Sequence, residues 1–475
     1  MPRRWGCVVR AAGRGIAAGA LGAVLAFGGN ASAQTLEQAL KQAYENNPQL
    51  NAQRAILRQT DEGVPQALSG YRPRISATAS AGTQNQATVS RTNPASQTPA
   101  LYSNLSGTNA PHSVGLSASQ TLFNGFQTAN RTRAAESQVL AARETLRLLE
   151  QQVLLDAATA YMNLLRDTAI LDLQRRNVEV LQEQLRQTRD RFNVGEVTRT
   201  DVAQSESRLA AGRSQLLGAE ANHTTSRAAY RRVIGVEPGR LAPGTPVERF
   251  SPARLDLAVA RGQAENPSVT AAMYGVDVAA LQVKISEGAL YPTLTLTGSI
   301  QRNWESTLTQ LQTFNASLLG QLTVPIYQGG AEYSAIRQSK ELLGQRRLDL
   351  DTSRDQARAN VVQSWGQLQA AKAQIEATQA QVNAAEIALN GVREEARVGQ
   401  RTTLDVLNAQ QELVNARVAL VTAQRDRVVA SYALLSATGR LSPQVLGLRV
   451  NLYDPRVHYH QVRDAWSGVR TPDGK

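Results

Sequence analysis

Mostly apolar residues recur in steps of three and four along two long stretches of the chain, which predicts long amphipathic helices. In the first stretch these positions are Leu146, Leu149, Val153, Ala157, Tyr161, Leu164, Thr168 and Leu171. In the second stretch they are Leu350, Ala357, Val361, Trp365, Leu368 and Ile375. A period of about 3.6 residues is close to the spacing of coiled coils. We therefore expect long helices over about 127–193 and about 331–397, each ~100 Å long at 1.5 Å per residue.

Each long helix is expected to end at a Val-Gly pair and to be followed by a shorter return helix. The pairs are Val194-Gly195 and Val398-Gly399. Glycine is the usual residue where a helix ends in the left-handed conformation, and Thr198 and Thr402 are candidate N-caps of the next helices. The return helices should cover about 198–234 and about 402–438. Their apolar stripe is narrow, so we expect them to contact neighbours along seams and water elsewhere.

Shorter segments alternate between apolar and polar residues with a period of two, which predicts β-strands. The alternation is clearest over about 292–304 and 313–325, and weaker over about 74–90 and 112–124. Over the first of these segments one face carries Leu294, Leu296, Gly298 and Ile300, and the other carries Thr293, Thr295, Thr297 and Ser299. One apolar and one polar face on segments of roughly ten residues fit a membrane barrel with a wet interior. A half-buried sheet of a soluble protein is the alternative.

The same order of elements occurs twice because the chain is internally duplicated. Residues 194–202 match residues 398–406 at a spacing of 204 positions, with five identities in nine. Nearer the N-terminus the spacing is 219, so the first copy holds a 15-residue insertion in the Pro/Ser/Asn-rich stretch around 91–111. Each copy should contain a short helix, two strands and two long helices. The domains that we assign are repeat 1 over 34–250, repeat 2 over 251–440 and a C-terminal tail over 441–475.

Residues 1–33 have the layout of a secretory signal peptide. Four arginines precede an apolar run from Ile16 to Phe27, and a small-residue cleavage site ends at Ala33. A membrane anchor is the less suitable alternative, since the run is shorter than the ~20 residues of a spanning helix. Beyond this segment no stretch of 18 or more apolar residues occurs, so only strands that close into a barrel could enter a bilayer. Four strands per chain are fewer than the about eight that a barrel needs, so two or three chains would have to combine theirs.

The charge of the 475-residue chain does not indicate nucleic-acid binding. Lys and Arg number 51 against 39 Asp and Glu, a formal net charge of +12, but four of the arginines lie in the signal peptide. The other basic residues alternate with acidic ones along the helices, as on solvated helix faces. The single cysteine, Cys7, also lies in the signal peptide. The exported chain is therefore expected to have no disulfide, no cysteine metal ligand and no cysteine-linked lipid.

No residue pattern in the chain indicates catalysis. The sequence contains no phosphate-binding loop, zinc-binding helix motif or nucleophile elbow. The four histidines are scattered apart from His458 and His460, which we assign to a solvated tail rather than to a metal site. We expect neither an enzyme nor a bound cofactor or metal.

The signal peptide, the duplicated strand–strand–hairpin units and the Val-Gly turns together resemble the TolC family of outer-membrane efflux and secretion channels. The tail segment 447–455, followed by His458-Tyr459 and Trp466, looks like that of the type I secretion branch. The resemblance implies an α+β, mostly α fold. Long helical hairpins would form a periplasmic α-barrel, and four strands per chain would contribute to a 12-stranded transmembrane β-barrel of a trimer.

The resemblance also implies location and partners. The homotrimer would lie in contact with outer-membrane lipid and would act as an exit duct for efflux or type I secretion. It would work with a periplasmic adaptor and with an inner-membrane ABC or proton-driven transporter, and the substrate would pass through unchanged. The alternative from the residues alone is a soluble periplasmic coiled-coil adaptor or scaffold, which would need no detergent for extraction.

The residues that the resemblance implies for the gate lie at the hairpin tips. Arg401 matches an arginine that bonds an aspartate at the position of Asp201 in another subunit. Asp405 would lie one turn further along and face the lumen, where three copies form an acidic ring that selects cations. Asn408 stands where better-known members have a second aspartate, and Ala396 stands where some relatives have a tyrosine of the lock.

A purely structural role is the alternative for both aspartates. Asp201 and Asp405 each lie three residues after a threonine, which suits carboxylates in the first turn of a helix. The residues of the turns themselves are also implied to contact the adaptor, and they are Val194, Gly195, Val398 and Gly399.

Overall fold

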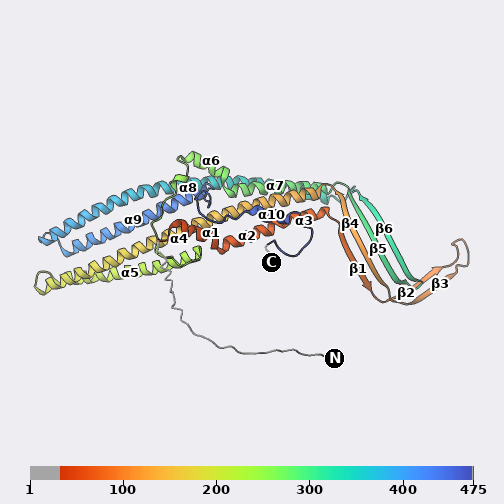
Figure 1. The fold of residues 1–475 in the computed structure, drawn as a ribbon, viewed down its shortest axis with the longest axis horizontal. Helices are drawn as coiled ribbons and strands as arrows, with labels where there is room; N and C mark the ends of the chain where they lie inside the picture. The colour runs from red at the N-terminus through yellow and green to blue at the C-terminus, as the bar shows by residue number, and fades with distance from the viewer. Residues whose placement is uncertain (1–32, 473, 475) are drawn as a thin grey trace, which may run out of the picture.

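The computed structural model describes residues 33–472 and 474 as an elongated molecule. The expected signal peptide, 1–33, lies outside the described residues except for Ala33. Figure 1 shows two long helical hairpins at one end, a twisted β-sheet at the other and short helices packed along the middle. None of the described helices is both long enough and apolar enough to span a membrane.

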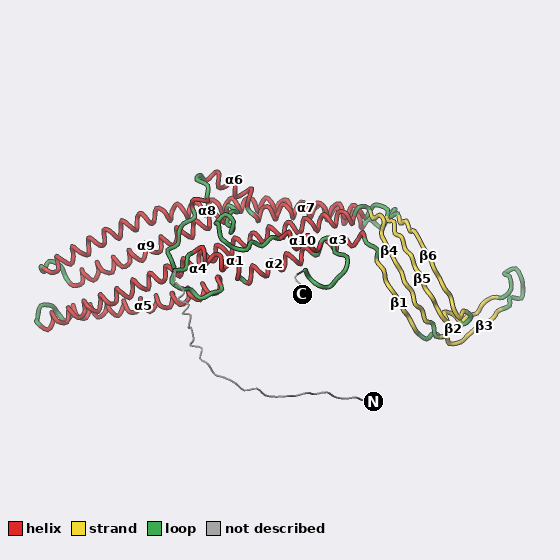
Figure 2. The backbone as a smooth tube through the Cα atoms, in the orientation of Figure 1, coloured by secondary structure: helices red, strands yellow, loops and turns green. Residues whose placement is uncertain are grey.

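The two hairpins occupy the ranges that the apolar period predicts. The first consists of α4 (Gln127–Asn193) and α5 (Arg199–Ile234), and the second of α8 (Ala331–Arg397) and α9 (Thr403–Ala437). Each of α4 and α8 has 67 residues and is therefore ~100 Å long. The two hairpins lie side by side and both tips point to the same end of the molecule (Figure 2).

The short helices differ from the prediction of a single one in each repeat. Repeat 1 has α1 (Leu36–Asn46), α2 (Pro48–Asp61) and α3 (Gly63–Leu68), and repeat 2 has α6 (Leu255–Glu265) and α7 (Pro267–Gly288). The prediction is wrong because Asn47 and Asn266 each precede a proline, which disfavours helical geometry at the preceding residue. Each asparagine instead caps the next helix, with proline as its first residue.

Both repeats contribute to one antiparallel sheet of four strands. Its strands are β1 (Arg74–Ala81), β4 (His112–Asn124), β5 (Thr293–Thr307) and β6 (Gln310–Thr323), in the order β1-β4-β5-β6. The central pairing of β4 with β5 joins the repeats, for example through Leu116 opposite Ile300. Within the described residues no strand pairs with the outer edges of β1 and β6. Unpaired edges of this kind are free to join strands of another chain.

The first predicted strand and the insertion need correction. The strand expected over about 74–90 is two strands, because β1 ends where Ala81 pairs with His112. After Gly82-Thr83 the chain leaves the sheet as β2 (Gln84–Arg91), which pairs only with β3 (Tyr102–Asn109). The insertion is therefore not only a loop, since its second half contains β3.

The main core lies in the middle of the molecule, where the bases of the hairpins meet the short helices. Leu40, Leu57, Leu154 and Leu435 are fully buried there. Tyr161 is also fully buried, and its hydroxyl oxygen lies 2.8 Å from the carbonyl oxygen of Gln34 and 2.6 Å from that of Ala242, which share its single donor. Burial raises the pKa of Tyr161 to about 12. This packing holds the hairpin bases in place, whereas the tips extend away from it.

The C-terminal segment is only in part the solvated tail that we expected, since His460 is exposed whereas His458 is buried. It contains α10 (Pro455–Val462), which packs against α2. His458 is 8 % exposed, and its Nδ1 lies 3.0 Å from Oδ2 of the fully buried Asp61. The prediction was wrong for His458 because a short helix can be buried by a partner almost 400 residues away.

Candidate gate at the tips of the helical hairpins

Both hairpins turn through the same local structure. Gly195 and Gly399 have φ angles of 81° and 79°, in the left-handed region that glycine adopts without strain. Thr198 and Thr402 then cap α5 and α9. The predicted turns and N-caps are therefore confirmed at both tips.

The two candidate aspartates complete these caps. Asp201 Oδ2 accepts from the backbone N–H of Thr198 at 2.9 Å, and Asp405 Oδ2 accepts from that of Thr402 at 3.0 Å. In return, each threonine hydroxyl accepts from the backbone N–H of its aspartate. Such reciprocal bonds satisfy two backbone donors that a helix start leaves free. The capping that the structural alternative predicts is therefore present for both aspartates, and their role in a gate stays a prediction.

The caps also keep both carboxylates ionised. Hydrogen bonds from the side chain and backbone of Thr198 lower the pKa of Asp201. Hydrogen bonds from the backbone and side chain of Thr402 lower the pKa of Asp405. Because only Oδ2 of each group takes part in the cap, a capping carboxylate still presents negative charge at the tip. Capping and an acidic ring are thus compatible roles.

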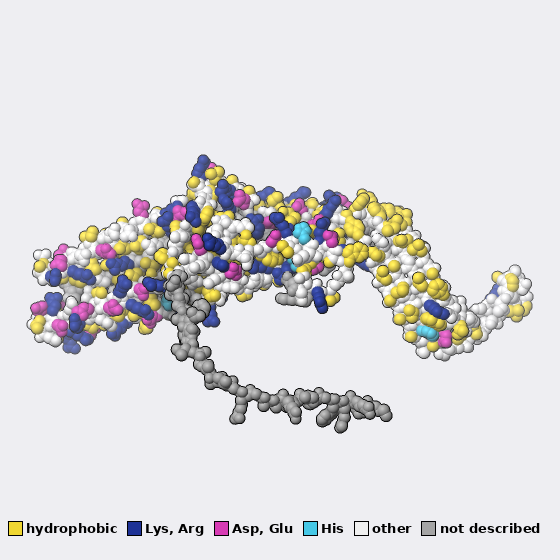
Figure 3. Space-filling model, in the orientation of Figure 1, with side chains coloured by type: hydrophobic (Ala, Val, Ile, Leu, Met, Phe, Trp, Pro, Cys, Tyr) yellow, Lys and Arg dark blue, Asp and Glu magenta, His cyan; other side chains and the backbone are white. Residues whose placement is uncertain are grey.

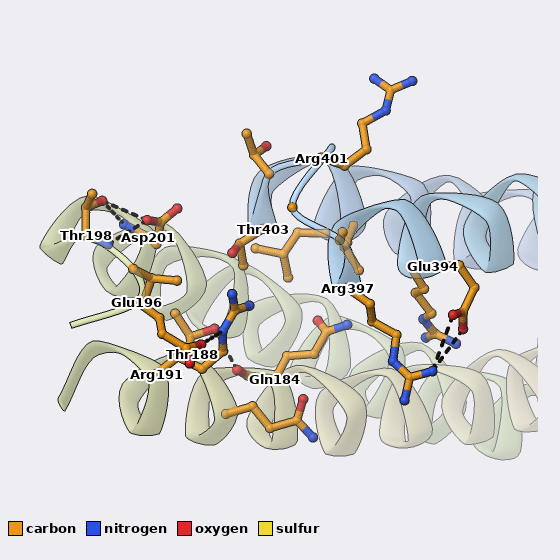
Figure 4. A pocket seen from close by; sticks show the side chains of 18 residues that line it. Gln184, Thr188, Arg191, Glu196, Thr198, Asp201, Glu394, Arg397, Arg401 and Thr403 are labelled. Carbon is orange, nitrogen blue, oxygen red and sulfur yellow. Dashed lines mark hydrogen bonds and ion pairs between the residues drawn. The ribbon is translucent and has the colours of Figure 1, made fainter. Parts of the chain in front are cut away.

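Arg401 pairs within its own hairpin in this chain. Its Nε donates to Glu395 Oε2 at 2.8 Å, and this carboxylate raises the pKa of Arg401. Figure 4 shows that Arg401 points away from Asp201, which lies on the other hairpin. The structure therefore does not join these two residues within one subunit. A bond between Arg401 and Asp201 of a neighbouring subunit stays a prediction.

An open-sided cavity of about 590 Å³ separates the two tips. The first hairpin lines it with residues that include Thr188, Arg191 and Asp201, and the second with residues that include Arg397 and Thr403 (Figure 4). Besides Arg401, two more arginines of the lining pair with glutamates of their own hairpins: Arg191 with Glu196 at 3.0 Å and Arg397 with Glu394 at 3.2 Å. These ion pairs stabilise each tip separately and do not join the two tips.

Near the tips an apolar contact region, which we call the tip seam, joins the hairpins behind this cavity. Leu407 of α9 is 2 % exposed. It packs into a cluster formed by Val178, Leu181, Leu185 and Leu209 of the first hairpin. Beside it, Arg208 donates to Asn408 Oδ1 at 2.5 Å. Asn408 therefore binds α5 within its own subunit.

The second hairpin also has a core of its own near the tip. Its buried members are Val382, Ala385, Leu389, Leu413 and Ala416. Arg393 additionally donates to Gln410 Oε1 at 3.0 Å across this hairpin. Each hairpin can therefore hold together without the other, and the tip seam is the part that opening of the two hairpins would separate.

The sequence did not indicate the main residues of the tip seam. Val406, Leu413 and Leu420 pack inside the second hairpin, whereas Leu407 faces the first hairpin, so the apolar stripe of α9 does not indicate this contact. Arg208 and Asn408 are 200 residues apart, and no local pattern pairs them.

The remaining predicted tip residues are exposed. Val194 and Val398 are 72 % and 71 % exposed, and a Cβ added at Gly195 or Gly399 would meet no described atom within 4 Å. Within residues 33–472 and 474 no group of three or more His, Cys, Asp or Glu side chains could hold a metal ion. Both valine side chains are therefore largely uncovered by the described chain.

The chain matches known proteins over most of its length. The family described as "Outer membrane efflux protein" matches residues 39–236 and 259–440. Outer membrane efflux protein BepC of Brucella suis is 43 % identical over 446 residues, 94 % of each chain. Outer membrane protein TolC of Vibrio cholerae is 28 % identical over 87 % of this chain and 92 % of that protein. Alkaline protease secretion protein AprF of Pseudomonas aeruginosa is 28 % identical over 66 % of this chain and 67 % of that protein.

Solved structures share the fold. The CmeC outer membrane channel of Campylobacter jejuni superposes with a TM-score of 0.74 at 17 % identity, over 90 % of this chain and 89 % of that one. The outer membrane protein VceC of Vibrio cholerae superposes with a TM-score of 0.69 at 21 % identity, over 85 % of this chain and 96 % of that one. Long duplicated hairpins joined to a small sheet are therefore an architecture that known channels also have.

Proposed function

The chain belongs to the outer membrane efflux protein family, and we propose that three copies assemble into one exit duct. It is an outer-membrane channel for efflux or secretion, in line with relatives named for both activities. The trimer, the gate residues and the partner proteins form the proposed part of this function.

The open four-stranded sheet is the observation that carries assembly from more than one chain, and the family favours three. A closed barrel needs about eight strands or more, whereas β1 and β6 each keep one unpaired edge among the described strands. Three copies supply twelve strands, with β1 of one subunit beside β6 of the next. Exposed apolar side chains such as Leu116, Ile300 and Leu318 then face lipid, while the serine- and threonine-rich face lines a wet interior.

The hairpins continue the same conduit away from the membrane. Three copies supply twelve long helices, which together form the wall of the conduit. The polar faces of these helices allow water both inside and outside this wall. We assign no chemical step to the chain, so the substrate passes through unchanged. Which substrate passes is set by the transporter, because the chain supplies a duct rather than a closed binding pocket.

The partners are a periplasmic adaptor and an inner-membrane transporter, either of the ABC class or driven by protons. The exposed Val194 and Val398 at the turns are the residues that we assign to adaptor contact, together with Gly195 and Gly399. Their exposure supports this assignment, since apolar side chains at a tip gain free energy when a partner covers them.

The gate lies at the same tips. Arg401 bonds Asp201 of the neighbouring subunit in the closed trimer, and Asp405 forms an acidic ring around the lumen. Asn408 contributes no second ring, which its bond to Arg208 supports. Opening requires α8 and α9 to move away from the first hairpin.

The test is conductance of the purified mature chain in a planar lipid bilayer. A channel gives discrete current steps from a preparation that requires detergent for extraction. A soluble periplasmic adaptor or scaffold gives neither property, so release of the chain without detergent and silent bilayers would refute the proposal.

A further inference from the structure

A shallow apolar groove crosses the apolar face of the sheet. It has a volume of about 540 Å³, and its lining includes Ile75, Leu116, Ala118, Gly298, Ile300 and Leu318. Gly298 lies in its middle, because this residue pairs with Ala118 on β4 and with Leu318 on β6 and has no side chain of its own. Figure 3 shows hydrophobic side chains gathered over the visible face of the sheet.

A cationic and aromatic cluster lies at one end of this groove. Alternate residues of a strand share a face, so Arg302 and Trp304 continue the line of Gly298 and Ile300 along β5. The guanidinium carbon of Arg302 lies 5.2 Å from the centre of the Trp304 ring. The ring of His112 on β4 stacks on Trp304 with centroids 5.1 Å apart and planes inclined by 10°. At ~3.4 Å per residue, Arg302 lies about 7 Å beyond Ile300.

The charge of Arg302 is not neutralised within the described chain. None of the described carboxylates lies within ion-pair distance of it, and its side-chain partner there is the amide oxygen of Gln312 on β6. The nearest acidic residue along the strand, Glu305, accepts from the backbone N–H of Ala110 at 3.1 Å. Arg191, Arg397 and Arg401 at the tips, in contrast, each pair with a glutamate. An unpaired cation beside an apolar membrane face favours an anionic partner from outside the chain.

We propose that this cluster binds the headgroup of an anionic, phosphate-bearing membrane lipid, and that an acyl chain of this lipid fills the groove at Gly298. A guanidinium binds phosphate through two parallel hydrogen bonds. Tryptophan is favoured where hydrocarbon meets headgroups. The inference rests on the proposed function, since it requires the apolar face to meet lipid. The cluster lies on β4 and β5, and the groove is lined by all four strands of the same sheet, so each subunit of a trimer carries one complete copy.

The experiment is native mass spectrometry of the full mature trimer in detergent, titrated with phosphatidylglycerol or phosphatidylcholine that carry the same acyl chains. We expect phosphatidylglycerol to bind about fivefold more tightly per site, which is the preference that one arginine near a membrane surface supplies. Arg302→Gln should remove this preference, whereas Arg302→Lys, which keeps the charge but not the two parallel hydrogen bonds, should keep part of it.

A matched control and a groove variant separate the two halves of the site. Arg74→Gln removes an exposed strand arginine on the opposite face, since Arg74 pairs with Ser119 rather than with Ala118, and should leave the preference unchanged. Gly298→Val should weaken both lipids alike by filling the groove. Its Cβ would lie 3.6 Å from Leu318 Cδ1, an ordinary contact that the strand can accommodate.

Equal affinity for the two lipids in the parent trimer would overturn the lipid site, and so would an unchanged preference in Arg302→Gln. If Arg74→Gln lost as much of the preference for phosphatidylglycerol as Arg302→Gln, the lipid site would also be overturned. The net charge of the protein, rather than the position of Arg302, would then explain the binding. Failure of the proposed function is a different result, in which the same preparation gives no trimer and no conductance.

Discussion

Replacement of Leu407 by alanine tests how the tips are held closed. Leu407 is 2 % exposed, and it is the α9 side chain buried in the tip seam against Val178, Leu181, Leu185 and Leu209 of the other hairpin. Shortening it removes most of the apolar contact between the hairpins at the tip. The internal core of the second hairpin, which contains Leu413, stays intact.

The size of the effect follows from the buried volume that the variant loses. Truncation of a buried leucine to alanine costs about 2–5 kcal/mol. For Leu407→Ala we expect the lower part of this range, about 2–3 kcal/mol. Val202 and Leu216 beside the seam are only partly buried, so the neighbours of the shortened side chain can relax. This energy corresponds to a shift of about 30- to 150-fold towards separated hairpins.

The assay is single-channel recording in planar bilayers, with Leu413→Ala as the matched control. Leu413 lies on the same helix and is 5 % exposed, but it packs inside its own hairpin. We expect Leu407→Ala to raise the conductance or the open fraction, and Leu413→Ala to change mainly thermal stability. Equal channel behaviour in the two variants would refute the role of the tip seam.

Three further predictions concern the charged residues of the tips. Asp405→Ala should abolish block by trivalent cations applied from the periplasmic side, because it removes the acidic ring; equal block in variant and parent would count against the ring. Arg401→Ala and Asp201→Ala should each raise single-channel conductance by loosening the closed state, and an unchanged conductance in both would reject the bond between subunits. Because hydrogen bonds lower the pKa values of Asp201 and Asp405 below the ordinary 3.8, the caps stabilise the tips at neutral pH and lose this contribution only as the pH falls through the lowered values. Conductance should therefore stay constant from about pH 7 to about pH 5, and a titration of the tips within that range would contradict the cap geometry.

The long helices could be predicted from sequence because their signals are local. Proline-free stretches with a regular apolar period fix the ranges of α4 and α8. Gly195, Gly399 and the threonines after them mark the turns through backbone geometry that only neighbouring residues determine. The capping role of the aspartates could be read from the same Thr-x-x-Asp spacing.

The errors arose where distant segments decide the structure. The alternation of residues continues past Gly82, so the pattern alone could not show that β2 leaves β4 and pairs with β3. His458 is buried by Asp61 of α2, and Leu407 by leucines of the first hairpin. A periodic pattern shows that a residue is suited to burial, but it does not name the element that buries it.

The most direct test of the central claim is the mass of the detergent-solubilised complex measured by native mass spectrometry. Four strands with two unpaired edges, together with membership of the outer membrane efflux protein family, predict an assembly of three mature chains, from which a single conducting channel is obtained on reconstitution. A monomer or a dimer that still conducts, or a species that stays dispersed without detergent, would contradict the claim that three chains close one duct.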